Sequence, residues 1–322
     1  MMNRAWRRLV SQNRLPFALF LLAATIVVNI ILQPNFLEPG TLNGSMRVFL
    51  PLILVAVGQS IVILGGGIDI SAGAIVSIVN TILATQVGVR GEPGTAALMM
   101  VLVLFVGMAA GAINGFFVAI LRLQPIITTY ATSFLFGGLA LLILPSPGGG
   151  MPSQFTSFYR ETMPVGLPLA FFVIALIMLA WYGVRQTRYG RYLFAVGGNP
   201  DAAYQTGVPV NTVQFSTYVV SGLMSAFAGI ALSLLTGSGN AGIGDSLTLA
   251  AITAVVIGGT ALSGGVGGIG GPIIGAITLG LLPNIISFSR IETWWQTFLN
   301  AAIIVLALAT PGVINLFRRR RT

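Results

Sequence analysis

The stretch TAALMMVLVLFVGMAAGAINGFFVAIL at 95–121 decides the fold class of this chain. It contains no charged residue, and its apolar side chains do not alternate with polar ones. A helix of this length can cross a hydrocarbon layer of about 30 Å, and it satisfies its own backbone hydrogen bonds, which lipid cannot do. Strands of an outer-membrane barrel are about ten residues long and alternate with period 2. The stretch therefore predicts a transmembrane helix.

The rest of the chain has the same character. Of its 322 residues, 55% are hydrophobic and only 7% are charged, whereas a soluble domain carries about 25% charged residues. Two apolar runs are weaker than the others and are candidates for broken or half-spanning helices: 68–87 carries several polar residues, and 247–262 is short and ends in glycines. We predict an all-α, polytopic membrane protein that forms a single transmembrane domain over 1–322, with about ten spans: 15–32, 46–64, 68–87, 95–121, 125–144, 167–184, 212–235, 247–262, 269–288 and 294–316.

The arginines predict the orientation of these spans. With the N-terminus inside, the cytoplasmic segments collect twelve of the sixteen: Arg4, Arg7, Arg8, Arg14, Arg122, Arg185, Arg188, Arg191 and Arg318 to Arg321. The outside receives Arg47, Arg90, Arg160 and Arg290. This bias agrees with the positive-inside rule and predicts that both termini are cytoplasmic.

Several residue types are missing, and this excludes classes of chemistry. The chain has no Cys, His or Lys. Thiolate or imidazole metal sites, His-based acid–base catalysis and a Lys Schiff base are therefore excluded, and we expect neither catalytic residues nor a cofactor or metal. The net charge of +9 comes from arginines that flank apolar segments, so we expect a lipid bilayer and no nucleic acid as partner. A phosphate loop is absent, so any ATP-driven step needs a partner protein.

The longest informative polar stretch is 185–211. Asn199 is suited to the N-cap of a helix, Pro200 to its first position, Asp201 to its first turn and Gly207 to its end. This pattern predicts a two-turn cytoplasmic helix. Such a short helix is marginal in water and needs a packing partner, which is either this chain's own interfacial surface or a cytoplasmic protein. The residues alone leave both open.

Two similar glycine motifs lie far apart in the chain. GGIDISAG at 66–73 and GGTALSGG at 258–265 share the pattern G-G-x-x-[IL]-S-x-G, and each lies beside one of the weak spans. Such paired segments point to an internal repeat and to a transport pathway. The alternative is that these glycines only permit close helix packing.

Polar residues within the spans are the candidates for lining a pathway. Asp69 is either an intramembrane functional carboxylate or, with Ser71 assisting, the N-cap of the third span, and we favour the cap. The neutral polar residues either line the pathway or form interhelical hydrogen bonds. The candidate pathway residues are Asp69, Ser71, Asn80, Asn114, Thr128 and Thr129.

Three motifs in order, GGIDISAG at 66–73, GRYLFAVGGNPDAAYQTGV at 190–208 and IGGTALSGGVGGIGGPIIGAITLGLLPN at 257–284, resemble the permease subunits of ribose-type ABC sugar importers. The resemblance covers about 40–316 and implies that 197–208 contains the coupling helix that docks on the ATPase. Two departures are Tyr204, where the family often has a basic residue, and QPIITTYATSFLFGG at 124–138. The implied ATPase-coupling residues are Gly197, Gly198, Asn199, Pro200, Asp201, Ala202, Ala203 and Gly207.

The resemblance implies a non-catalytic permease in a bacterial inner membrane that imports a monosaccharide such as ribose, galactose or xylose. Its implied partners are a cytoplasmic ATPase, a second permease that is identical or homologous, and a periplasmic sugar-binding protein. Alternatives are a permease for an autoinducer-type sugar derivative or a branched-chain amino acid. An ion-coupled secondary transporter is disfavoured because such proteins usually keep several carboxylates or His in mid-membrane.

Overall fold

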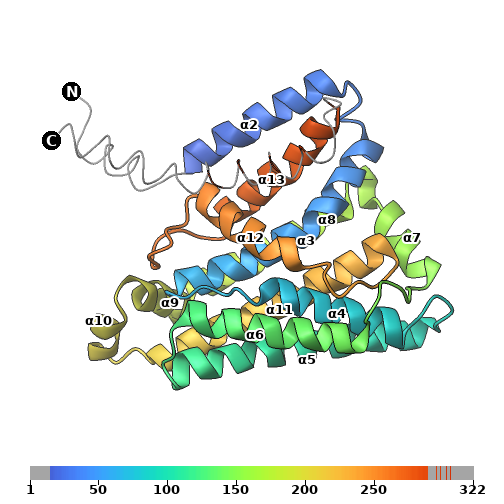
Figure 1. Cartoon of the computed structure of the whole chain (residues 1–322). Helices are drawn as coiled ribbons and strands as arrows, with labels where there is room; N and C mark the ends of the chain where they lie inside the picture. Colours follow the sequence, from blue (N-terminus) through green and yellow to red (C-terminus); the bar gives the residue numbers. More distant parts are fainter. Residues whose placement is uncertain (1–14, 289–294, 296–297, 299–301, 303–304, 306–322) are drawn as a thin grey trace, which may run out of the picture.

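A computed structural model describes residues 15–288 and the single positions 295, 298, 302 and 305. Over these residues the chain is helical, with short connections (Figure 1). Four of the α-helices begin with a proline, at the position where a backbone N–H would have no partner within the helix. The elements are α2 (Leu15–Leu32), α3 (Pro39–Leu64), α4 (Ala72–Gln86), α5 (Pro93–Gly115), the π-helix η1 (Phe116–Ile120), α6 (Pro125–Ile143), α7 (Ser153–Glu161), the 3-10 helix η2 (Pro164–Gly166), α8 (Leu169–Gln186), α9 (Arg188–Gly198), α10 (Pro200–Gln205), α11 (Val210–Thr236), α12 (Asp245–Ile257) and α13 (Gly270–Phe288).

Seven helices in the described part of the chain are long and apolar enough to cross a membrane: α2, α3, α5 with η1, α6, α8, α11 and α13. The two spans predicted to be weak form shorter apolar helices, α4 with 15 residues and α12 with 13. At 1.5 Å per residue these cover about 20 Å, which is less than the hydrocarbon layer. Only four single positions of the predicted span 294–316 are described, and both termini lie outside the described residues, so the total of ten spans and the orientation stay predictions.

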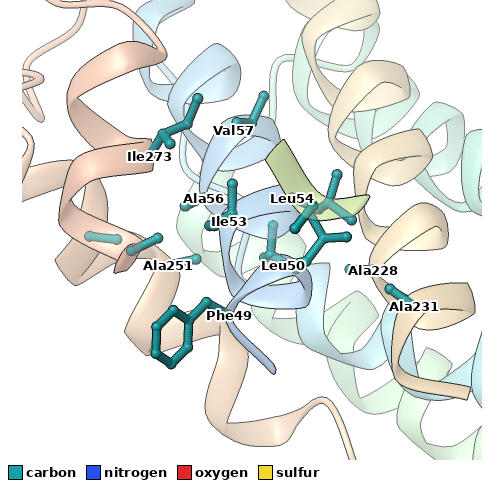
Figure 2. Packing of buried hydrophobic residues seen from close by; sticks show 14 of the residues in the cluster. Phe49, Leu50, Ile53, Leu54, Ala56, Val57, Ala228, Ala231, Ala251 and Ile273 are labelled. Atoms are coloured by element: carbon teal, nitrogen blue, oxygen red, sulfur yellow. The ribbon is translucent and has the colours of Figure 1, made fainter. Parts of the chain in front are cut away.

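Helix α3 lies at the centre of the molecule. In the most apolar stretch of 18 residues of α3, 83% of the residues are buried. The corresponding shares are 11% for α2 and 6% for α8. Figure 2 shows Leu50, Ile53 and Leu54 of α3 among small side chains of the neighbouring helices, including Ala228 of α11 and Ala251 of α12. The outward faces of α2 and α8 carry large apolar side chains such as Phe20 and Leu176. This distribution fits a bundle with a packed centre and lipid around it.

Close backbone contact joins α5 to α11. A Cβ added at Gly222 would overlap the carbonyl oxygen of Gly107, and one added at Gly111 would overlap that of Tyr218. Because lipid removes the hydrophobic driving force between helices, their association depends on such close packing and on hydrogen bonds. Small residues therefore stabilise the packing of α5 against α11.

Candidate functional site

The short helix α10 projects from one end of the bundle, beside α9, while α7 lies at the opposite end (Figure 1). Asn199 is its N-cap, and the Asn199 side-chain oxygen accepts a hydrogen bond from the N–H of Ala202 at 3.0 Å. Its end is closed by Gly207 with φ of +82°, whose N–H donates to Tyr204 O while the N–H of Val208 donates to Ala203 O. These are the bonds of a Schellman motif. The predicted helix and its stop and start residues are confirmed.

Helix α9 precedes α10 and anchors it, and it was not predicted. Thr187 caps it by accepting from the N–H of Gly190 at 3.2 Å. Its Tyr189 hydroxyl lies 2.7 Å from Ser216 Oγ of α11. Burial raises the pKa of Tyr189 above its usual value.

One side of α10 is packed and the other is free. Ala203 lies in a buried apolar cluster together with Leu64 of α3 and Leu193 and Val196 of α9. On the outer side, Asp201 and Ala202 are exposed, and Tyr204 is 72% exposed. Helix α10 is thus held on its own protein by its inner face while its outer face is available to a partner.

Asp69 lies at the centre of a buried polar site between α3 and α4. Its side chain is fully buried. Oδ1 accepts from the N–H and the hydroxyl of Ser71 at 2.9 and 2.7 Å, and Oδ2 accepts from the hydroxyl of Ser221 of α11 at 2.7 Å. The N-cap of α4 is Ser71. The N–H of Gly73 donates a hydrogen bond to Thr248 Oγ1 of α12. The interpretation of Asp69 as the N-cap of this helix is therefore wrong. The Asp69 carboxyl group accepts from Ser71, before the first residue of the helix, and the N–H of Gly73 in the first turn donates to the hydroxyl of Thr248.

Further polar side chains extend this site to α5 and α6. Asn114 Nδ2 donates to Ser71 Oγ at 2.7 Å, and Asn114 Oδ1 accepts from the hydroxyl of Thr132 at 2.6 Å. Thr129 Oγ1 donates to the carbonyl oxygen of Ile68 and accepts from the N–H of Ile70. We call this set the polar node: Gln59, Asp69, Ser71, Asn114, Thr129, Thr132 and Ser221.

The main chain of Asp69 is held as well. When the amide orientation of Gln59 is assigned from its partners, the side chain donates to Asp69 O at 2.9 Å and accepts from Asp69 N at 3.2 Å. The segment 65–71 is irregular, largely buried backbone, and in a membrane protein such backbone is tolerated only where protein groups satisfy it. The polar node supplies those groups.

The predicted pathway residues thus divide into three groups. Asp69, Ser71, Asn114 and Thr129 meet in the polar node. Asn80 lies elsewhere: its Nδ2 donates to Ser233 Oγ and Ser238 O, and its Oδ1 accepts from the N–H of Asn240. Thr128 is buried on α6 but is not part of the node. The structure shows pairing with other segments for the side chains of the node and for Asn80, and the role of all six residues in a pathway stays a prediction.

Each of the two glycine motifs ends a helix, and both helices end in the same way. Gly66 and Gly259 have φ of +85° and +84°, and each follows the last turn of a helix, α3 and α12. The N–H of Gly66 donates to Ile63 O and that of Gly259 to Val256 O. In the structure Gly66 therefore corresponds to Gly259, whereas the sequence pattern aligned Gly66 with Gly258, one residue earlier. Both motifs therefore encode a Schellman end where the chain leaves a helix inside the bundle.

Some residues of the node gave little sequence signal. Gln59 is a polar residue within an apolar run and was detectable on that ground. Ser221 and Thr132 were not, and neither was Thr248, which lies outside the node, because small hydroxyls occur throughout apolar helices and usually bond their own backbone. Within the described residues, no group of three or more acidic, Cys or His residues is placed to hold a metal ion.

Comparison with known proteins shows the family of the chain. The family model described as the permease component of branched-chain amino acid transport systems matches residues 41–308. The chain belongs to this permease family. Both the polar node and the α9–α10 segment fall within the matched residues of the permease.

Several curated members of this permease group are similar over nearly their whole length. The chain is 32% identical to the ribose import permease protein RbsC of Escherichia coli K12, covering 95% of this chain and 94% of that protein. It is 34% identical to RbsC of Bacillus subtilis 168 (93% and 92%) and 33% identical to the autoinducer 2 import system permease protein LsrD of Photorhabdus temperata (91% and 91%). No solved structure matches the chain.

Proposed function

We propose that this chain is the transmembrane permease subunit of an ATP-driven importer for a monosaccharide of the ribose class. The observation that carries the proposal is the similarity to ribose import permeases over nearly the full length of both chains. The apolar bundle, with seven described helices long enough to span a bilayer, supports a multi-pass location in a bacterial inner membrane. The permease provides the route for the sugar and is not itself an enzyme.

The α9–α10 segment is the part that meets the ATPase. Its outer face is exposed, its inner face is anchored, and its first turn carries Asp201. A helix with both ends capped keeps its shape while a partner pushes on it. We assign the ATPase-coupling role to residues 197–208 of the single transmembrane domain.

Transport then follows alternating access. A periplasmic sugar-binding protein delivers the sugar to the outer face of two permease subunits, and ATP binding and hydrolysis in the cytoplasmic ATPase switch the pair between outward-open and inward-open states. A second permease, identical or homologous, completes the pathway.

A second candidate substrate is an autoinducer-type sugar derivative. The autoinducer 2 permease is 33% identical to this chain, which is within the range of the ribose permeases. Overall identity therefore does not separate the two substrates. The family description alone supports a branched-chain amino acid, and none of the three relatives compared above carries that name.

The test is reconstitution. The chain is co-expressed with its genomic neighbours, purified, and placed in proteoliposomes with the ATPase and binding protein. Uptake of ribose, autoinducer 2 and leucine is compared with and without ATP. ATP-dependent uptake of ribose supports the proposal, preference for autoinducer 2 supports the second candidate, and uptake driven by an ion gradient without any ATPase refutes both.

A further inference from the structure

Three chain segments that are far apart in sequence meet, backbone against backbone, where α9 ends. The N–H of Gly265, in the connection between α12 and α13, donates to the carbonyl oxygen of Leu64, in the last turn of α3, at 3.2 Å. A Cβ added at Gly197 of α9 would overlap Leu64 O and lie 2.6 Å from Gly265 N. We call Leu64, Gly66, Gly197, Gly264 and Gly265 the glycine junction.

The glycines of the junction face one another from both sides. A Cβ at Gly264 would lie 2.5 Å from Gly197 O, and one at Gly265 would lie 2.5 Å from Gly198 N. Gly66, Gly264 and Gly265 also have positive φ, which side chains rarely adopt. Only glycine satisfies both the space and the backbone conformation here. With no side chains between the backbones, a displacement of one segment cannot be absorbed by a change of rotamer.

On its cytoplasmic side the junction is tied to α10. Leu64 of α3, Leu193 and Val196 of α9 and Ala203 of α10 share one buried cluster. Interiors packed in this way transmit strain. A force on the exposed face of α10 therefore reaches Leu64 through Ala203 and through the end of α9.

On its other side the junction leads into the polar node. The segment that follows Leu64 runs to Asp69, whose carboxyl group is bonded to Ser71 and Ser221. The same segment is held by Thr129 of α6. Contacts thus continue without a break from α10 to the irregular backbone before α4.

We propose that the glycine junction transmits the displacement of docked α10 to the segment 65–71, and that Gly264 is its positioning residue. This inference rests on the proposed function, in which α10 docks on the ATPase. A chain of contacts alone does not establish coupling, so the proposal is tested by separating ATP hydrolysis from sugar transport.

The test uses the complete complex in proteoliposomes with Gly264→Ala, because Gly264 lies outside the docking segment 197–208 and an added Cβ there would lie 2.5 Å from Gly197 O. The control is Gly183→Ala in α8, where an added Cβ meets no atom within 4 Å. We expect Gly264→Ala to keep co-purification of the ATPase and basal ATP hydrolysis, while sugar transported per ATP falls about tenfold, within the usual range of coupling between sites. Gly183→Ala keeps the wild-type ratio. An unchanged ratio in Gly264→Ala overturns the proposal.

A second measurement does not depend on a junction variant that folds. The chain has no Cys, so spin labels are placed at Arg191→Cys on α9 and at Val266→Cys beside the junction, and separately at Arg191→Cys and Leu142→Cys at the far end of α6. On ATP binding we expect the first distance to stay constant and the second to change. A change in the first as large as that in the second overturns the proposal. Wild-type uptake reports on the proposed function independently of both tests.

Discussion

Asp69 offers the sharpest test of what the polar node does. Asp69→Ala removes the acceptor of three hydrogen bonds, from the Ser71 N–H, the Ser71 hydroxyl and the Ser221 hydroxyl. The hydroxyls can turn toward other acceptors, but the buried N–H cannot, and leaving it unpaired costs about 1–3 kcal/mol. The lost interhelical bond to Ser221 adds about 0.6 kcal/mol. With the Ser71 hydroxyl included, we expect a loss of about 2–4 kcal/mol in the free energy of unfolding.

Asp69→Asn is the informative companion. Its amide oxygen still accepts from Ser71, and its NH₂ donates to Ser221 once that hydroxyl turns. We therefore expect a cost below about 1 kcal/mol and sugar uptake close to wild type. Glu92→Ala is the control for loss of a carboxylate, because Glu92 is exposed and makes no capping hydrogen bond.

Stability is measured by detergent-induced unfolding in mixed micelles, followed by tryptophan fluorescence, and uptake is measured in proteoliposomes. The reasoning predicts wild type, Glu92→Ala and Asp69→Asn close together, and Asp69→Ala well below them. If Asp69→Asn were stable but inactive, the charge and not the pairing would be what the site needs. That result would refute a structural role for Asp69 and favour an ion-coupled transporter.

Three further predictions follow from other contacts. Asn80→Ala leaves the Asn240 N–H and the Ser238 carbonyl without their partner, so the free energy of unfolding should fall by about 1–3 kcal/mol; a loss of uptake at unchanged stability would instead support a pathway role. Asn199→Ala removes the α10 cap, so the free energy of unfolding should fall by about 1 kcal/mol and less ATPase should co-purify. Asn199→Asp should keep the stability and the co-purification of the wild type. If as much ATPase co-purified with Asn199→Ala as with the wild type, docking through α10 would be contradicted. Arg160→Met removes two hydrogen bonds from the guanidinium to Leu235 O at the end of α11. The free energy of unfolding should fall by about 1.5–3 kcal/mol, and amide hydrogen exchange should become faster in α7 alone. Equally faster exchange across the whole bundle would contradict this local role.

Much of the local structure could be read from residues close together in the chain. The cap at Asn199, the proline that follows it and the glycine that ends α10 all act within a few residues, so their pattern predicted the helix correctly. Helix α9 was not predicted, because its stretch is short and amphipathic and was interpreted as part of a connecting segment. The weak spans were detected because polar residues and glycines interrupt their apolar runs, and the structure makes them the shortest apolar helices.

Composition by itself determined that this is a helical membrane protein, since hydropathy and local capping depend on neighbouring residues alone. That the protein is a permease was implied by the resemblance of its three motifs to a known family. The tertiary structure decided which polar groups pair. Asp69 and Ser221 are 152 residues apart, and the junction joins Leu64 to glycines beyond 190. In lipid, apolar side chains cover inward and outward faces alike, so periodicity does not reveal which face a helix buries. Only the packing of the helices brought these backbones and side chains together.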